Sequence, residues 1–265
     1  MKKRNLLLTL GITALCVILV VTLLVYTLNP PTALQRAINF FDGSREPYAL
    51  LWLDVMHRHF GIAEFADALQ RYDQEITKRT DEAPLLRVFR RIADHDNQLQ
   101  DGDLQAVSVD VDRITVPALY CDQLGLTDNY PAMLEGAAVQ GGYLLTHALL
   151  ACVWLKENGF GVPLSAFFIQ DMYRATAALI GNDPVVTDLE LEAAAFLYLA
   201  GQGALVDGAF VDRVIAVQNY DGGWLLSSNT PGKSDWHPSI LGLFLLLHRE
   251  YPADSYPSML DPASP

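Results

Sequence analysis

The sequence predicts an all-α protein in which one N-terminal transmembrane helix is followed by antiparallel helix hairpins. Three observations favour this fold class. Residues 6–28 carry no charge, and most of the remaining chain repeats apolar residues at the i, i+3 and i+4 spacing of a helix. The connections between these segments are short and rich in Gly, Pro, Asn and Asp, as in packed helix hairpins. With 265 residues, the chain is long enough to bury a sizeable core.

The N-terminal segment has the features of an uncleaved signal anchor. Lys2, Lys3 and Arg4 precede a run of about 23 uncharged residues, and roughly 20 apolar residues are enough to span a bilayer as a helix. A cleavable signal peptide has a shorter apolar core and a cleavage site between small residues. Because positive charges stay inside, we expect a single-pass protein with a cytoplasmic N-terminus and an extracytoplasmic body, periplasmic or extracellular.

Amphipathic helices are expected between the anchor and residue 93. Pro30 and Pro31 end the anchor helix and can begin the next one. The expected helices are residues 33–41, 47–60, 62–78 and 83–93. A polar stretch, residues 94–103, follows them and is the best candidate for a boundary. Residues 107–116 alternate partly between β-branched and polar residues, and we expect a short strand or an irregular extended segment there.

The second half is expected to consist of longer helix hairpins. Residues 131–157 are mostly apolar and small, which is typical of an inner helix in a packed array. The further expected helices are residues 164–180, 188–200, 209–218 and 238–251. The chain therefore divides into a cytoplasmic tip with its anchor, an N-terminal helical region and a second helical region, at residues 1–29, 30–100 and 101–265.

The most informative motif lies near the C-terminus. It reads Q-x-x-x-G-x-W and consists of Gln218-Asn219-Tyr220-Asp221-Gly222-Gly223-Trp224. The glycines permit the turn that ends a helix, and the Trp ring can be buried while its N–H meets a carbonyl. The motif resembles the QW motif of α/α-toroid proteins, the class of squalene-hopene cyclases and protein prenyltransferase β-subunits. This resemblance covers roughly residues 130–251 and implies a partial or small α/α toroid more than it implies a reaction.

A toroid implies a central cavity, and several residues are candidates to line it. These are Tyr143, His147, Asp221, Trp224, Asp235, Trp236 and His237. Prenyltransferases of this class bind zinc through an Asp, a Cys and a His. Residues of the types that could hold such a divalent metal are Cys121, Asp122, His147, Asp235 and His237. The chain lacks the D-x-D-D acid motif of the cyclases and does not match the D-x-C spacing of the prenyltransferases.

Two further groups of residues are the cysteines, for which two interpretations are open, and a set of carboxylates, for which we expect a structural role. Cys121 and Cys152 can form a disulfide in an extracytoplasmic body or stay as two buried thiols. Asp188, Glu190 and Glu192 begin an expected helix, where negative charges interact favourably with the helix dipole.

The net charge of −13 argues against binding to nucleic acid through a basic surface. Two other functions fit the sequence. The first function is a membrane-anchored, extracytoplasmic α/α-toroid-like binding or scaffold domain without chemistry of its own. The alternative is an enzyme that acts in the toroid cavity on a lipid-like or glycan-type substrate, with or without a metal. The enzyme is favoured if Tyr143, His147, Asp221, Asp235 and His237 meet in one concave site.

Overall fold

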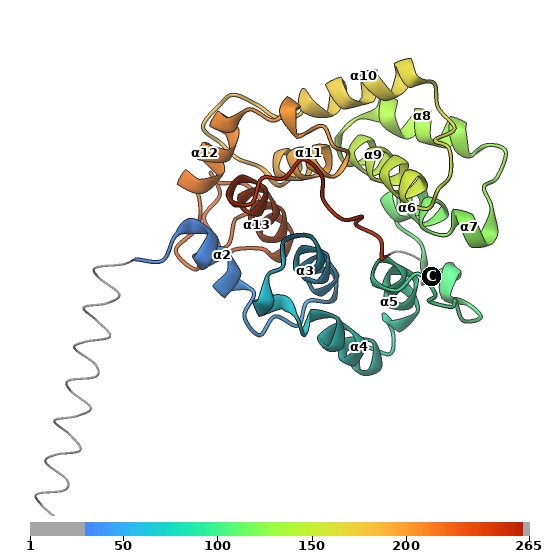
Figure 1. The fold of residues 1–265 in the computed structure, drawn as a ribbon, viewed down its shortest axis with the longest axis horizontal. Coiled ribbons are helices and arrows are strands. Elements are labelled where there is room, and N and C mark those ends of the chain that lie inside the picture. Colours follow the sequence, from blue (N-terminus) through green and yellow to red (C-terminus); the bar gives the residue numbers. More distant parts are fainter. Residues whose placement is uncertain (1–29, 262–265) are drawn as a thin grey trace, which may run out of the picture.

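The computed structural model describes residues 30–261, and this portion of the chain is helical, without a β-strand. Its helices form two layers around a common centre (Figure 1). The inner layer consists of α3 (Pro47–Phe60), α5 (Ala83–Arg90), α6 (Asp110–Leu119), α9 (Gly142–Glu157), α11 (Asp188–Leu199) and α13 (Trp236–Glu250). Outside lie α2 (Ala33–Phe40), α4 (Ala68–Lys78), α7 (Cys121–Leu124), α8 (Tyr130–Gln140), α10 (Ala166–Ala177) and α12 (Gly208–Ala216).

The inner helices form a closed ring. Helix α13 packs on both α3 and α11, and α9 packs on both α11 and α6. The hydroxyl of Tyr120, at the end of α6, donates to the Val88 carbonyl of α5 at 2.8 Å. Helix α5 returns to α3 through a short 3-10 extension, Arg91–Ala93. The expected antiparallel hairpins are therefore arranged so that the last hairpin meets the first.

One hydrophobic core connects the two sides of the polar stretch at residues 94–103. Leu50 and Leu86 from the first side belong to the same buried cluster as Leu149 and Leu245 from the second. The two expected helical regions, residues 30–100 and 101–265, thus share a single core.

The expectation of a strand or extended segment at residues 107–116 is wrong, because α6 begins at Asp110. Asp110 and Asp112 lie in the first turn, where the helix dipole favours carboxylates. Ile114 and Val116 become buried, and α6 packs closely along α9. The β-branched residues lower the helix propensity by only a fraction of a kcal/mol, which this burial outweighs.

The single helix expected over residues 131–157 is also wrong, because the chain breaks between α8 and α9. Gly141 and Gly142 have φ angles of +75° and +57°. Residues with a side chain rarely adopt this left-handed region, whereas glycine does so readily. The glycine pair therefore reverses the chain from the outer α8 to the inner α9.

The Q-x-x-x-G-x-W motif joins three helices. The Trp224 ring is 1% exposed, and its Nε1–H donates to the Val214 carbonyl of α12 at 2.7 Å. The Gln218 side-chain amide donates to the carbonyls of Ala33 in α2 and Gly222, at 2.9 and 2.8 Å. Trp224 also packs directly on Gly242 of α13. The motif therefore fastens the outer helices α2 and α12 to the inner helix α13.

The predicted transmembrane segment, residues 6–28, lies outside the described residues, as does the whole expected tip and anchor, residues 1–29. Within residues 30–261, none of the helices combines the length and the apolar character that a membrane crossing requires.

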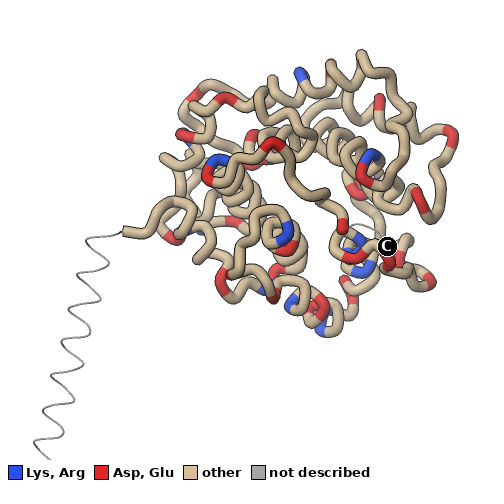
Figure 2. Tube along the Cα trace, in the orientation of Figure 1, with Lys and Arg blue, Asp and Glu red and all other residues tan. Residues whose placement is uncertain are grey.

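The basic residues of α5 serve internal ion pairs. Figure 2 shows Lys and Arg side by side on α4 and α5, while Asp and Glu are spread over the described molecule. Arg87 lies 2.6 Å from a carboxylate oxygen of Asp103, and Arg90 and Arg91 bind Asp73 and Asp122 at 2.7 and 2.5 Å. These pairs hold α5 and its 3-10 extension, which begins at Arg91, to their neighbours, so these three arginines are engaged within the fold.

Candidate active site

Five inner helices direct their N-terminal ends toward one mouth of the ring. The first two turns of these helices place the following side chains around one cavity: Tyr48 of α3, Asp112 of α6, His147 of α9, Glu192 of α11 and His237 of α13. The N-terminal end of a helix carries partial positive charge, so their convergence favours negative groups at this mouth. The fold thus gathers polar side chains from segments that are distant in sequence.

Glu192 is the centre of the polar cluster. Its side chain is 0% exposed, and the Thr146 hydroxyl donates to its Oε1. The Nδ1 atom of His147 lies 3.3 Å from Oε1, and the Nε2 atom of His237 lies 3.4 Å from Oε2. Oε2 has no hydrogen-bond partner among the described residues. A fully buried carboxylate therefore stands between two imidazoles with one oxygen still open to a donor.

Asp188 supports the same cluster from one turn earlier in α11. Its Oδ1 lies 2.7 Å from Nδ1 of His237, and its Oδ2 accepts a hydrogen bond from the Tyr143 hydroxyl at 2.6 Å. Burial, together with the nearby Asp188 carboxylate, raises the pKa of Tyr143. Tyr143 therefore stays a neutral donor that orients Asp188.

The two histidines differ in their surroundings. Both ring nitrogens of His237 lie beside carboxylates. Burial lowers its pKa, but the hydrogen bond and charge of Asp188 and the charge of Glu192 outweigh this, so the net pKa is raised. His147 has the Tyr143 carbonyl 2.8 Å from its Nδ1, in addition to Glu192. Because both neighbours are acceptors, Nδ1 carries the proton, which leaves Nε2 available to a ligand.

Asp112 supplies a second kind of carboxyl group to the cavity. Burial raises its pKa, and the charge of His147 opposes this effect without reversing it. A carboxyl group in such surroundings holds its proton to a higher pH than one in water. The cavity therefore contains one carboxyl whose pKa is raised by burial, Asp112, and one, Glu192, that lies beside Thr146 and two imidazoles.

The walls of the cavity are mainly aromatic. Its volume is about 200 Å³. The aromatic lining residues are Tyr48, Trp52, Phe89, Trp154, Phe196 and Trp236. Tyr48 stacks with Trp236 at a centroid separation of 6.1 Å, and Trp52 stacks with Phe196 at 6.0 Å. Flat apolar faces with a polar cluster on one side are typical of a small-molecule site.

The structure brings together only some of the cavity candidates. His147, Trp236 and His237 line the cavity, and Tyr143 binds Asp188 at its edge. The other three candidates lie outside the cavity: Trp224 is in the core, Asp221 accepts from Ser234 in an exposed turn, and Asp235 is the N-cap of α13.

The five candidate metal ligands do not share one place either. Cys121 is buried at the start of α7, and Asp122 binds Arg91 and His95. His147 and His237 meet at Glu192 instead. Among residues 30–261, no group of three or more His, Cys, Asp or Glu side chains is arranged to hold a metal ion.

Of the two states considered for Cys121 and Cys152, a disulfide or two thiols, the structure has two thiols. Cys121 and Cys152 are both buried free thiols. Burial raises the pKa of Cys121 to about 11 and of Cys152 to about 12, so neither is a reactive thiolate near neutral pH.

Sequence reasoning missed Asp112, Asp188 and Glu192 as site residues. Interpreting the carboxylates of residues 188–192 as charges favourable to the helix dipole is correct for Asp188 and Glu190, which lie in the first turn, and Glu190 also forms a capping box with Thr187. Asp188 and Glu192, however, lie one turn apart in a helix whose twelve residues include no Lys or Arg. Two carboxylates on an apolar helix without a basic partner were the signal that could have identified them.

Comparisons with protein-family models, with curated proteins and with solved structures found no match for this chain. The functional conclusion therefore depends on the geometry of the site.

Proposed function

We propose that this chain is a membrane-anchored, extracytoplasmic enzyme that cleaves a glycan-type substrate by acid–base catalysis in the cavity of an α/α-toroid-like domain. The anchor is the predicted segment 6–28, and the toroid assignment follows from the Q-x-x-x-G-x-W motif together with the closed ring of inner helices. The five residues whose meeting would favour an enzyme do not all meet, because Asp221 and Asp235 lie outside the cavity. The enzyme is therefore proposed on Asp112 and Glu192 instead, and the binding or scaffold function predicted first from the sequence is the alternative outcome of the experiment below.

The observation that carries this proposal is that Glu192 is fully buried while its Oε2 has no hydrogen-bond partner among the described residues. A buried carboxylate oxygen without a hydrogen-bond partner costs free energy, and natural proteins keep few such groups outside functional sites. The Thr146 hydroxyl donates to the other oxygen, Oε1, and the imidazole rings of His147 and His237 lie 3.3 and 3.4 Å from the carboxylate, which fixes its orientation. Such an arrangement suits a base or nucleophile that must meet a substrate in one geometry.

Asp112 and Glu192 divide the chemical roles. Hydrolysis of a glycosidic bond needs one carboxyl that donates a proton to the leaving oxygen and one that activates water or attacks the sugar. Burial raises the pKa of Asp112, which fits the donor. Glu192, held among hydrogen-bond donors, fits the second role. Two carboxyls in different environments can thereby take different roles.

The lining of the cavity favours a glycan over a lipid. The C–H faces of a sugar ring stack on flat aromatic side chains such as Tyr48, Trp52 and Trp236. The hydroxyl groups at the rim of the same ring need hydrogen-bond partners, for which Glu192 and the Nε2 atom of His147 are available. A lipid chain would leave these buried polar groups without partners, at a cost of about 1–3 kcal/mol each.

The test is hydrolysis of a panel of oligosaccharides by the full-length protein in detergent, with Asp112→Asn and Glu192→Gln variants. We expect each variant to lose at least about 100-fold in turnover, as general acid–base groups contribute roughly 10²–10⁴-fold. Glu190→Gln is the matched control, because Glu190 is buried in the same helix but serves the capping box. Binding without turnover by the wild type would support the scaffold alternative. Neither binding nor turnover of any glycan would overturn the proposal.

A further inference from the structure

The chain that follows α13 does not leave the ring but crosses it. Figure 1 shows this C-terminal segment, residues 252–261, running from the end of α13 over the centre of the ring to α5. It covers the mouth opposite the acid–base cluster, where α3, α9, α11 and α13 end. The ring of Tyr256 packs on His248 and Phe60 there, with centroid separations of 4.4 and 5.2 Å.

Two charged side chains hold the backbone of this segment. The carboxylate of Glu157 accepts the N–H groups of Met259 and Leu260, both at 2.9 Å. Arg58 donates to the Met259 carbonyl at 2.9 Å and is itself bound to Asp54 at 2.9 Å. These contacts are made to backbone groups at a bend of the segment and not to a particular side chain.

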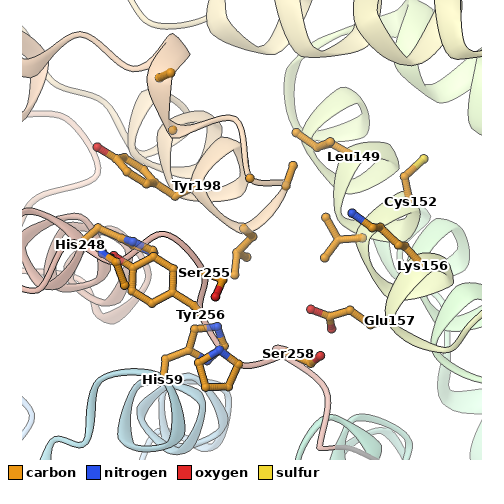
Figure 3. Close-up of a pocket in the computed structure, with 18 of the residues that line it drawn as sticks. His59, Leu149, Cys152, Lys156, Glu157, Tyr198, His248, Ser255, Tyr256 and Ser258 are labelled. Atoms are coloured by element: carbon orange, nitrogen blue, oxygen red, sulfur yellow. The ribbon is translucent and has the colours of Figure 1, made fainter.

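Met259 lines one cavity, and the residues directly before it line another. It lines the active cavity of about 200 Å³, and its sulfur accepts the Trp154 Nε1–H at 3.2 Å. Residues 252–258 line a larger cavity of about 780 Å³, shown in Figure 3 between Lys156, Tyr198 and His248. Helix α9 contributes a wall to both cavities.

We infer that residues 252–261 are a removable plug, with Met259 at its tip, that makes the active cavity a dead end. With the plug in place, only the end of a linear substrate fits; with the plug displaced, the two cavities join and an internal segment fits as well. The consequence for substrate length rests on the proposed function, whereas the plug itself does not.

The surface beneath the plug has the same character as the active cavity. Burial, together with the charge of Arg58, lowers the pKa of His59 to about 4, and burial lowers the pKa of His248 to about 3. Both are therefore neutral, and within the described residues His59 Nδ1 and His248 Nε2 have no hydrogen-bond partner. Aromatic faces beside unpaired ring nitrogens suit the hydroxyl groups of further sugar units.

The test releases the plug after folding. In the full-length chain, the exposed residues 253–255 are replaced with a site for a sequence-specific protease, and release is confirmed by mass measurement. Acrylamide, a small neutral quencher, then reports access to Trp154, which is 2% exposed in the intact chain. A Trp154→Phe variant isolates its signal, and a protein cut at the exposed residues 231–233 is the control. Met259→Gly, uncut, is a second way to open the passage.

We expect quenching to rise at least twofold after release and in Met259→Gly, but not in the control. The released protein should also cleave oligosaccharides blocked at both ends, which the intact protein rejects. Unchanged quenching after confirmed release would overturn the plug. Increased quenching without turnover of any oligosaccharide by either form would support the plug and instead count against the proposed function.

Discussion

At the scale of single residues, the proposed function depends on Glu192, a buried carboxylate of which only one oxygen accepts a hydrogen bond. The sequence position of Glu192 predicts its place near a helix start, and this prediction is correct. Its burial was not predictable, because it arises only when α9 and α13 bring His147 and His237 beside it. Trp224 is the opposite case: a local turn motif predicted both its buried ring and its hydrogen bond to a carbonyl.

His237 gives the fold a defined dependence on pH. Its folded-state pKa is raised above 6.5 by Asp188 and Glu192, although burial acts in the opposite direction. Its ion pairs therefore contribute fully below about pH 6.5 and are lost as the pH rises through the folded-state pKa. We expect the difference in unfolding free energy between wild type and His237→Gln to shrink as the pH is raised from about 6 to about 9. Denaturant melts at several pH values measure it, and a difference independent of pH would contradict the assignment.

Trp224→Ala should remove a fully buried aromatic ring and destabilise the protein by roughly 3–5 kcal/mol. The matched control is Tyr220→Ala in the same motif, because Tyr220 is 87% exposed and should change stability by less than about 0.5 kcal/mol. Equal denaturation midpoints for the two variants would show that the motif does not hold the ring closed.

At the scale of elements, helix type and order were largely predictable, and the breaks between helices were not. Apolar periodicity located α3, α10 and α13 within a few residues. It failed at Gly141 and Gly142, where apolar residues continue through a reversal of the chain. It also failed at α6, because β-branched residues favour strands in isolation but pack equally well on a neighbouring helix.

The reversal at Gly142 can be tested against a second glycine. Gly142→Ala forces a side chain into the left-handed region and should cost roughly 1–2 kcal/mol. Gly136, inside α8, has no positive φ, and a Cβ added there would meet no atom within 4 Å. Gly136→Ala should therefore stabilise the protein by up to about 1 kcal/mol. In thermal melts, we expect Gly142→Ala to lower the melting temperature and Gly136→Ala to raise it. A higher melting temperature in both variants would contradict the chain reversal at Gly142.

At the scale of the whole molecule, closure of the ring creates the site. Helix α13 packs on α3 and α11, and α9 packs on α11 and α6, so that Asp112, Glu192 and His237 line one mouth although they are far apart in sequence. Gln218 and Trp224 fasten the outer helices α2 and α12 to α13. The candidates His147 and His237 were predictable because each stands near the start of an apolar helix. Their meeting point was not, since it requires the curvature of the complete ring.

The predicted anchor, residues 6–28, implies a prediction about membrane topology. Three positive charges before residues 6–28 predict that the C-terminus lies outside the cytoplasm. A reporter active only outside the cytoplasm should therefore work when fused after residue 265. Activity of a cytoplasm-only reporter at the same position would contradict the predicted topology.

We propose that Asp112 and Glu192 act together on a glycan inside the ring. The most direct measurement is a crystal structure of the Glu192→Gln variant with an oligosaccharide that the wild type cleaves. We expect a sugar ring stacked on the aromatic wall. The glycosidic oxygen should lie within about 3.2 Å of Asp112, and the side chain at position 192 within reach directly or through one water. An oligosaccharide bound outside this cavity, or one whose glycosidic oxygen faces neither position, would contradict the claim.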